Sequence, residues 1–179
     1  MGHTAKMAEA AAQGAASVNS VNVQLFRIEA KDIVDGRFAN EEMLSRLDAS
    51  DAIIFGSPTY MGGPSAPFKA FADATAERWY DRKWANKLAA GFTVSSGPSG
   101  DKLNTLEYFV LLAAQHGMIW INPNLIPSGA PQHLNRLSSY IGVMGQAGQE
   151  SPEEAPNEAD KQTAEALGRR VAEWALKLG

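Results

Sequence analysis

The stretch that most constrains the fold is 51–71, which reads DAIIFGSPTYMGGPSAPFKAF. Ala52–Phe55 is short and wholly apolar, and it therefore predicts a buried strand. The prolines and glycines of Ser57–Pro64 predict an irregular loop. Ser65 is a suitable N-cap, and a proline in the first turn supports a helix over 66–77. This succession of strand, loop and helix is typical of an open α/β sheet.

The same alternation continues along the chain. Further apolar strands are predicted at 21–28, 88–94 and 118–121, and helices at 4–16, 40–47, 101–117 and 158–178. Such alternation predicts right-handed βαβ units, and hence a parallel sheet with helices on both faces. We expect one domain over all 179 residues. The stretches 122–135 and 142–157 are predicted to be irregular, and 145–157 to be the most mobile part.

Composition excludes several classes of protein. The chain has no cysteine, so disulfides, thiolate metal sites and thiol redox chemistry are excluded, and a cytoplasmic location is expected. The net charge of −4 argues against nucleic-acid and anionic-membrane partners. No apolar run approaches the roughly 20 residues of a membrane span, and no signal peptide is recognisable. Motifs for a metal site or a hydrolase triad are also missing.

Two predicted loops carry the candidate binding chemistry. Ligands of open α/β sheets bind outside the carboxyl ends of the strands, where Ser57–Pro64 and Ser95–Gly100 both lie. Their hydroxyls and backbone N–H groups, with Tyr60 and Met61, are suited to a flat ring with polar edges. The alternative interpretation is that both are ordinary surface loops built from turn residues.

A third candidate is the start of the first predicted helix, Gly2-His3-Thr4. A helix N-terminus with a glycine and a threonine suits a phosphate by geometry and dipole, although threonine also begins helices as a simple cap. His116 is either a structural histidine or a ligand contact. The aromatic segment Arg78–Asn86 is either a surface or oligomer contact, or a wall over a planar ligand.

Three segments together resemble a known family. GHTAKMAEA, DAIIFGSPTYMGGPSAPFKAFAD, and KLAAGFTVSSGPSG followed by QHGM are similar to the flavodoxin-fold NAD(P)H:quinone oxidoreductases of the WrbA type. The similarity in order and spacing extends over most of the chain. It implies a doubly wound sheet of order 2-1-3-4-5 that binds FMN at its switch point. It also implies two-electron transfer from NAD(P)H to quinones, and self-association as a dimer or tetramer.

The resemblance also implies a set of site residues. The first segment would contact the FMN phosphate, the second would hold the isoalloxazine ring, the third would contact the polar edge of that ring, and Trp79 would line the substrate side. The implied FMN contacts are Gly2, His3, Thr4, Pro58, Thr59, Tyr60, Met61, Gly62, Ser95, Ser96, Gly97, Gly100 and His116.

One departure from the family pattern changes the expectation. Family members begin with an apolar strand and a phosphate loop, whereas this sequence begins at the last residues of that loop. The predicted fold therefore lacks its first strand, the true start is expected upstream, and FMN binding is expected to be weak. Two alternatives follow, namely an electron-carrier flavodoxin and a truncated flavodoxin-like chain that does not retain FMN.

Overall fold

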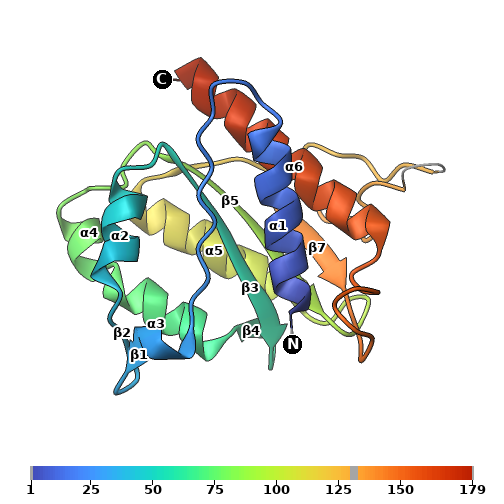
Figure 1. Cartoon of the computed structure of the whole chain (residues 1–179), viewed down its shortest axis with the longest axis horizontal. Helices are drawn as coiled ribbons and strands as arrows, with labels where there is room; N and C mark the ends of the chain where they lie inside the picture. Colours follow the sequence, from blue (N-terminus) through green and yellow to red (C-terminus); the bar gives the residue numbers. More distant parts are fainter. Residues whose placement is uncertain (1, 130–132, 179) are drawn as a thin grey trace.

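The computed structural model describes residues 2–129 and 133–178. Its central element is a sheet in the order β4-β3-β5-β6, with β7 also paired to β5. The strands β3, β5, β6 and β7 are parallel, and β4 is antiparallel to β3 (Figure 1). Their bounds are β3 Ala52–Tyr60, β4 Gly63–Pro64, β5 Leu88–Ser95, β6 Ile119–Trp120 and β7 Val143–Gln146.

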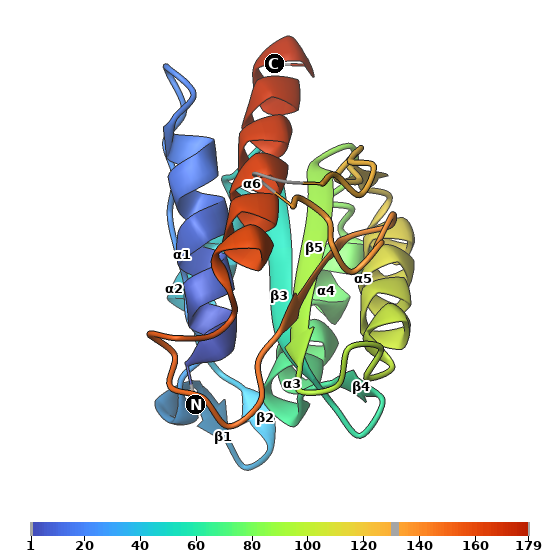
Figure 2. The ribbon, with the colours of Figure 1, turned by 90° about the vertical axis from the view of Figure 1, so that its right-hand side faces the viewer.

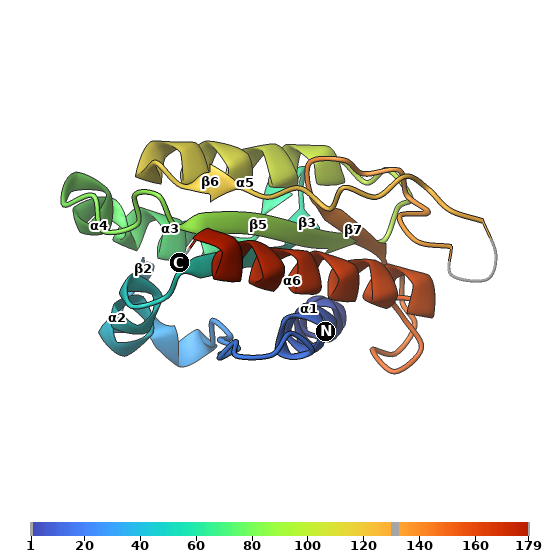
Figure 3. The ribbon, with the colours of Figure 1, turned by 90° about the horizontal axis from the view of Figure 1, so that it is seen from above.

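Helices cover both faces of this sheet, as Figure 3 shows. On one face α1 (His3–Ala16) and α6 (Glu158–Leu178) pack over a core that contains Met7, Leu167 and Val171. On the other face α2, α3 and α5 share a core with many aromatic rings. The remaining bounds are α2 Glu41–Asp48, α3 Ala66–Ala74, α4 Ala76–Tyr80 and α5 Lys102–His116. The α/β, flavodoxin-like fold predicted from the sequence is confirmed.

The stretch after Phe55 is more regular than predicted. Here β3 continues to Tyr60, and a turn at Met61-Gly62 leads into β4. The prediction of an irregular loop over Ser57–Pro64 was therefore wrong. Both turn residues have positive φ, 48° and 81°, as a two-residue type I′ hairpin turn requires. Pro58 is tolerated in β3 because alternate residues direct their N–H groups to opposite edges, and the edge away from β5 needs no donor.

The predicted strand at 21–28 is also wrong. No strand forms there, although Phe26 and Ile28 still pack against the aromatic core. Over residues 52–58, the edge of β3 that faces away from β5 has no partner strand within the described part of the chain. An alternating sequence becomes a strand when a neighbour pairs with its backbone, and no strand of the described residues pairs with 21–28.

Two other predicted elements differ in length. The helix predicted at 66–77 is interrupted at Thr75, whose hydroxyl donates to the carbonyl of Ala72 at 2.7 Å, and α4 begins afterwards. Such a bond to a carbonyl of the preceding turn favours a bend. The strand predicted at 118–121 shortens to the two residues of β6. The residues of β7 fall in the region 142–157 that was predicted to be irregular. A small hairpin of β1 (Ile33–Val34) and β2 (Arg37–Phe38) follows the 3-10 helix Ala30–Asp32.

The contact between α1 and α6 is unusually close. A Cβ atom on Gly14 would lie 1.9 Å from the carbonyl oxygen of Glu165, and a Cβ on Gly168 would lie 1.9 Å from that of Ala11. Glycine is therefore required at both positions, because any side chain would meet backbone. Among the residues described, none of the helices combines the length and apolar character that crossing a bilayer requires.

Candidate functional site

The three predicted binding segments lie at the same end of the sheet, where the parallel strands have their carboxyl ends. The carboxyl ends of β3 and β5, and the N-terminus of α1, are all found at the lower end of the molecule in Figures 1 and 2. The carboxyl end of the strands is where parallel α/β sheets bind ligands. The structure thus brings the Gly2–Thr4 segment, the β3–β4 hairpin and the loop Ser95–Gly100 to the same end.

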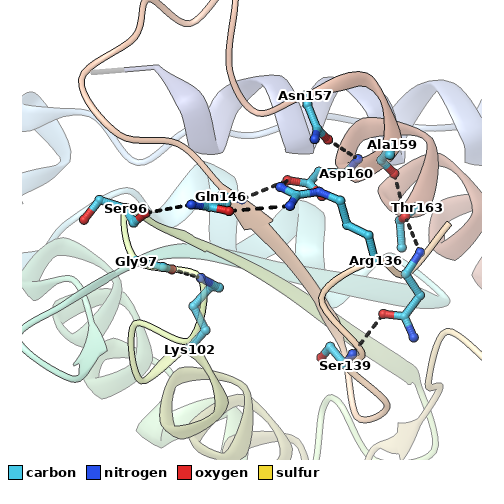
Figure 4. Close-up of polar contacts among 11 residues, drawn as sticks. Ser96, Gly97, Lys102, Arg136, Ser139, Gln146, Asn157, Ala159, Asp160 and Thr163 are labelled. Carbon is cyan, nitrogen blue, oxygen red and sulfur yellow. Dashed lines mark hydrogen bonds and ion pairs between the residues drawn. The ribbon is translucent and has the colours of Figure 1, made fainter. Parts of the chain in front are cut away.

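The loop Ser95–Gly100 is held from beneath by Lys102, the first residue of α5. The Lys102 side chain is fully buried, and its Nζ donates to Ser95 Oγ at 2.8 Å. The same Nζ donates to the carbonyl of Gly97 at 2.6 Å (Figure 4). Gly100 has a φ of 53°, and a Cβ there would lie 2.1 Å from Ser95 Oγ. These contacts define one compact shape for the loop.

This shape leaves two backbone donors directed away from β7. The carbonyl of Ser95 accepts from Ala147 N–H at 3.1 Å, and that of Ser96 accepts from Gln146 Nε2 at 3.3 Å, so both carbonyls point toward the β7 side. In a trans peptide the N–H points opposite to the carbonyl. The N–H groups of Ser96 and Gly97 therefore point away from these partners, and they have no hydrogen-bond partner among the described residues.

The β3–β4 hairpin presents a mixed surface to that side. Tyr60 is 58% exposed and Met61 is fully exposed, so both can meet a ligand. Thr59 is different, because its hydroxyl is buried and bonds to the hydroxyls of Thr93 at 2.8 Å and Thr105 at 2.7 Å. The Thr59 side chain therefore joins β3, β5 and α5 from within, a role that the sequence did not suggest.

The N-terminus of α1 has no side-chain cap. Gly2 occupies the N-cap position with a φ of 139°, and the first N–H groups of any helix lack intrahelical acceptors. One side is covered, since a Cβ on Gly2 would lie 2.9 Å from Pro152 and His3 Nε2 donates to the carbonyl of Glu150 at 2.8 Å. The remaining donors and the helix dipole suit a phosphate.

A buried polar network supports the loop from the β7 side, and sequence reasoning missed it. Arg136 forms a bidentate pair with Asp160, with Nε and Nη2 at 2.7 and 2.8 Å from its two carboxylate oxygens. The same carboxylate accepts from the backbone N–H of Gln146 at 2.9 Å (Figure 4). Gln146 in turn reaches Ser96, as described above, so α6 is connected to the loop. The four residues are far apart in sequence and form no motif.

His116 and Trp79 are not brought to these loops within one copy of the chain. His116 is the last residue of α5, a helix of 15 residues that is about 22 Å long and begins at Lys102. His116 therefore lies at the opposite end of the sheet, near the amino ends of the strands. It is 2% exposed, bonds to Thr75 Oγ1 at 2.9 Å and packs against the ring of Trp84. Trp79 belongs to α4 at the same far edge and is half-exposed. The flavin contact of His116 and the substrate role of Trp79 stay predictions.

The environment of His116 predicts a pH-dependent stability. Burial, and then the nearby charge of Arg82, hold the pKa of His116 below its ordinary value of 6.5, so the folded protein favours the neutral ring. The unfolded chain binds a proton as the pH falls through about 6.5. Stability is therefore complete above that pH and decreases below it, by at most about 1.4 kcal/mol per pH unit.

Urea unfolding between pH 7.5 and 5 measures this dependence. We expect the His116→Gln variant to lose less stability over this range than the unaltered chain, because the amide does not titrate. His133→Gln, at an exposed position, is the control and should follow the unaltered chain. Parallel curves for all three proteins would contradict the prediction.

Comparison with known proteins identifies the family. The model of the NADPH-dependent FMN reductase family matches residues 1–130. A crystal structure described as a flavodoxin, WrbA-like protein from Agrobacterium tumefaciens is 43% identical, with a TM-score of 0.73, over 98% of this chain and 91% of that one. The Trp repressor binding protein from Bacillus subtilis, at 16% identity and a TM-score of 0.59 over 92% of each chain, shares the fold.

Relatives of known name agree with this assignment. Flavodoxin FldP of Pseudomonas aeruginosa is 34% identical over 96% of this chain and 89% of its own length. An NAD(P)H dehydrogenase (quinone) of Archaeoglobus fulgidus is 40% identical over 74% of this chain and 63% of its own length. A protein of the same name from Geotalea uraniireducens is 29% identical over 99% of this chain and 94% of its own. The chain therefore belongs to the NADPH-dependent FMN reductase family, as an FMN-dependent oxidoreductase of the WrbA-type flavodoxin fold.

Proposed function

We propose that the chain binds FMN at the carboxyl edge of its sheet and uses it to transfer two electrons from NAD(P)H to a quinone. The observation that carries this proposal is the pair of N–H groups of Ser96 and Gly97, which lie at the same end of the sheet as the β3–β4 hairpin and have no partner in the described chain. Adjacent donors of this kind suit the carbonyl and nitrogen acceptors at the edge of a flavin ring.

The residues present fit the cofactor in three places. The uncapped N-terminus of α1, with Gly2, His3 and Thr4, would hold the phosphate. The loop Ser95–Gly100 would bind the polar edge of the ring. The hairpin would lie against the ring through Tyr60 and Met61 and the backbone of Pro58, Thr59 and Gly62, since the Thr59 hydroxyl is committed internally.

The chemistry balances with NAD(P)H and a quinone as the two substrates. FMN, when bound, supplies the hydride chemistry. NAD(P)H loses a hydride, which is two electrons and one proton, and the quinone gains it with one proton from solvent to give the hydroquinone. The chain's residues bind and orient, and no acid–base pair is required of them. Both substrates would use the same exposed side of the ring in turn, so ping-pong kinetics are expected.

A cytoplasmic location and self-association as a dimer or tetramer are part of the proposal. Trp79 could line the site of a second copy, because it is half-exposed at the far edge of its own chain. His116 could reach a second copy only after rearrangement, since it is 2% exposed and bonded to Thr75. Mixing a Trp79→Ala chain with a chain altered in the loop, and measuring recovered turnover, tests such sharing.

Flavin uptake and turnover test the proposed function together. Purified protein is titrated with FMN, and NAD(P)H consumption is followed with benzoquinone as acceptor. A yellow protein with turnover and parallel steady-state lines is the expected result. A colourless protein would contradict the proposal.

A second function, electron carriage between proteins, is favoured by one observation. The hairpin tip carries a fully exposed Met61 beside an exposed Tyr60, an apolar tip that suits a protein partner, and the relative from Pseudomonas aeruginosa is named a flavodoxin. A yellow protein that does not oxidise NAD(P)H directly would support this carrier function instead.

Replacement of Gly100 by alanine is expected to weaken FMN binding at least tenfold. Gly100 has a positive φ, which costs an L-residue about 1–2 kcal/mol. The added Cβ would also lie 2.1 Å from Ser95 Oγ, so the Ser95 side chain would have to move. The loop would then lose the shape that directs the Ser96 and Gly97 donors. Fluorescence titration with FMN measures the dissociation constant.

Gly117→Ala is the matched control for this prediction. Gly117 lies at the other end of α5 with a φ of 72°, and its added Cβ would meet the movable guanidinium of Arg82. The two variants should lose similar stability, whereas the FMN dissociation constant of Gly117→Ala should stay within about threefold of the original. Equal loss of FMN affinity in both would show that stability, and not the loop, governs binding.

A further inference from the structure

Lys102 is a buried cation without an anionic partner. It is 0% exposed, and both of its hydrogen bonds go to neutral oxygens, Ser95 Oγ and the Gly97 carbonyl. No carboxylate of the described residues forms an ion pair with it. Buried ammonium groups are costly and are usually paired, so this arrangement calls for a reason.

The neighbouring charges do not neutralise Lys102. Burial lowers the pKa of Lys102, while the charge of Asp160 favours the ammonium form and that of Arg136 disfavours it. The Asp160 carboxylate is already engaged by Arg136 at 2.7 and 2.8 Å. The three groups together therefore carry a net charge of +1, and Asp101, the adjacent acidic residue, is exposed to solvent. A positive charge remains beneath the loop, in surroundings that screen it less than water does.

The position of this charge relative to the loop gives it a function. The ammonium bonds to the carbonyl of Gly97, within the same turn that carries the Ser96 and Gly97 N–H groups proposed to meet the flavin edge. On reduction a flavin gains electron density at that edge. A fixed positive charge in the same turn as the donors would stabilise this added negative charge, and so the reduced form more than the oxidised form.

We propose that Lys102 is a positioning and charge-supplying residue, which holds the loop Ser95–Gly100 and makes the site bind reduced FMN more tightly than oxidised FMN. This inference rests on the proposed FMN site and adds a cause for its redox preference. The loop contacts alone would tighten both redox forms equally, whereas the charge distinguishes them.

The experiment compares the dissociation constants of oxidised and reduced FMN, through fluorescence titration and the midpoint potential of the bound flavin. Lys102→Gln keeps a donor for the Gly97 carbonyl and removes the charge. It should lower the preference for reduced FMN about tenfold, which is ~30 mV for a two-electron couple. Lys102→Met removes the donor as well as the charge. It should show the same change in preference, together with weaker binding of both oxidised and reduced FMN.

Two controls separate charge from structure. Ser95→Ala keeps the Lys102 charge and removes one anchor, so it should weaken both forms and leave their ratio unchanged. Lys83→Met removes an exposed lysine near Asp48, at the far edge, and should change neither form. Because Lys102→Met can fail to fold, Lys102→Gln decides the outcome, and a circular dichroism melt checks both.

The possible results are distinct. If Lys102→Gln binds FMN with an unchanged ratio between the two forms, the inference is overturned and Lys102 is a loop anchor alone. If the unaltered chain takes up no FMN in either form, the proposed function fails, and the inference fails with it. A lowered ratio in both Lys102 variants, with unchanged ratios in Ser95→Ala and Lys83→Met, supports the inference.

Discussion

Replacement of Gly168 by alanine is expected to destabilise the protein by about 3 kcal/mol, although the same change stabilises most helices by about 1 kcal/mol. The added Cβ would lie 1.9 Å from the carbonyl oxygen of Ala11, so α1 and α6 must move apart. The side chains between them, including Met7, Leu167 and Val171, would then lose close packing along the whole contact.

Urea unfolding followed by circular dichroism measures this loss. Gly14→Ala should behave alike, because its Cβ would lie 1.9 Å from the carbonyl of Glu165. Glu173→Ala, at an exposed position of α6, tests helix propensity without a clash and should change stability by less than about 0.5 kcal/mol. A Gly168→Ala variant as stable as the original would show that the helices can separate at little cost.

The second large effect is expected at Asp160, where replacement by asparagine should cost about 3 kcal/mol. The carboxylate is 1% exposed and accepts from Arg136 twice and from the Gln146 N–H once. An asparagine side chain offers one oxygen in place of two, and it leaves the Arg136 charge partly buried without its counter-charge.

Asp73→Asn is the matched control, since Asp73 pairs with Lys69 on the exposed surface of α3. Exposed pairs of this kind contribute little, so its loss should stay below about 0.5 kcal/mol. The Asp160→Asn variant should also loosen the loop through Gln146, which hydrogen–deuterium exchange at Ser96 and Gly97 would detect. Equal stability losses in the two variants would contradict the argument from burial.

Much of the fold was predictable because local signals were consistent. The apolar run at Ala52–Phe55 and the cap at Asn40, which accepts from the Met43 N–H at 2.9 Å, correctly indicated β3 and α2. The alternating stretch 21–28 misled, because a strand depends on a backbone neighbour that local sequence does not specify. The hairpin at Met61-Gly62 was missed because the prolines and glycines of Ser57–Pro64 were interpreted as an irregular loop between a strand and a helix, and not as the turn between two paired strands.

The position of the candidate site was predictable from the sequence, whereas the buried side-chain contacts that hold its loop were not. Small residues after an apolar strand indicated the loop Ser95–Gly100 and its position at the sheet edge. Nothing local indicated that Lys102 would be buried, or that Asp160 would join Arg136, since these contacts arise from distant segments. A lysine at the first position of a helix, next to a loop of small residues, is the one signal that could have suggested its role.

The pairing of α1 with α6 has a consequence for synthesis on the ribosome. The two helices are far apart in the sequence although they are in contact. For example, Arg169 Nε donates to Ser17 Oγ at 3.3 Å, and these residues are 152 positions apart. Once α1 has been translated, its apolar side therefore has no helix partner until α6 has emerged. During that interval Met7 and Ala11 are exposed, and a chaperone that binds short apolar helices would meet the nascent chain there.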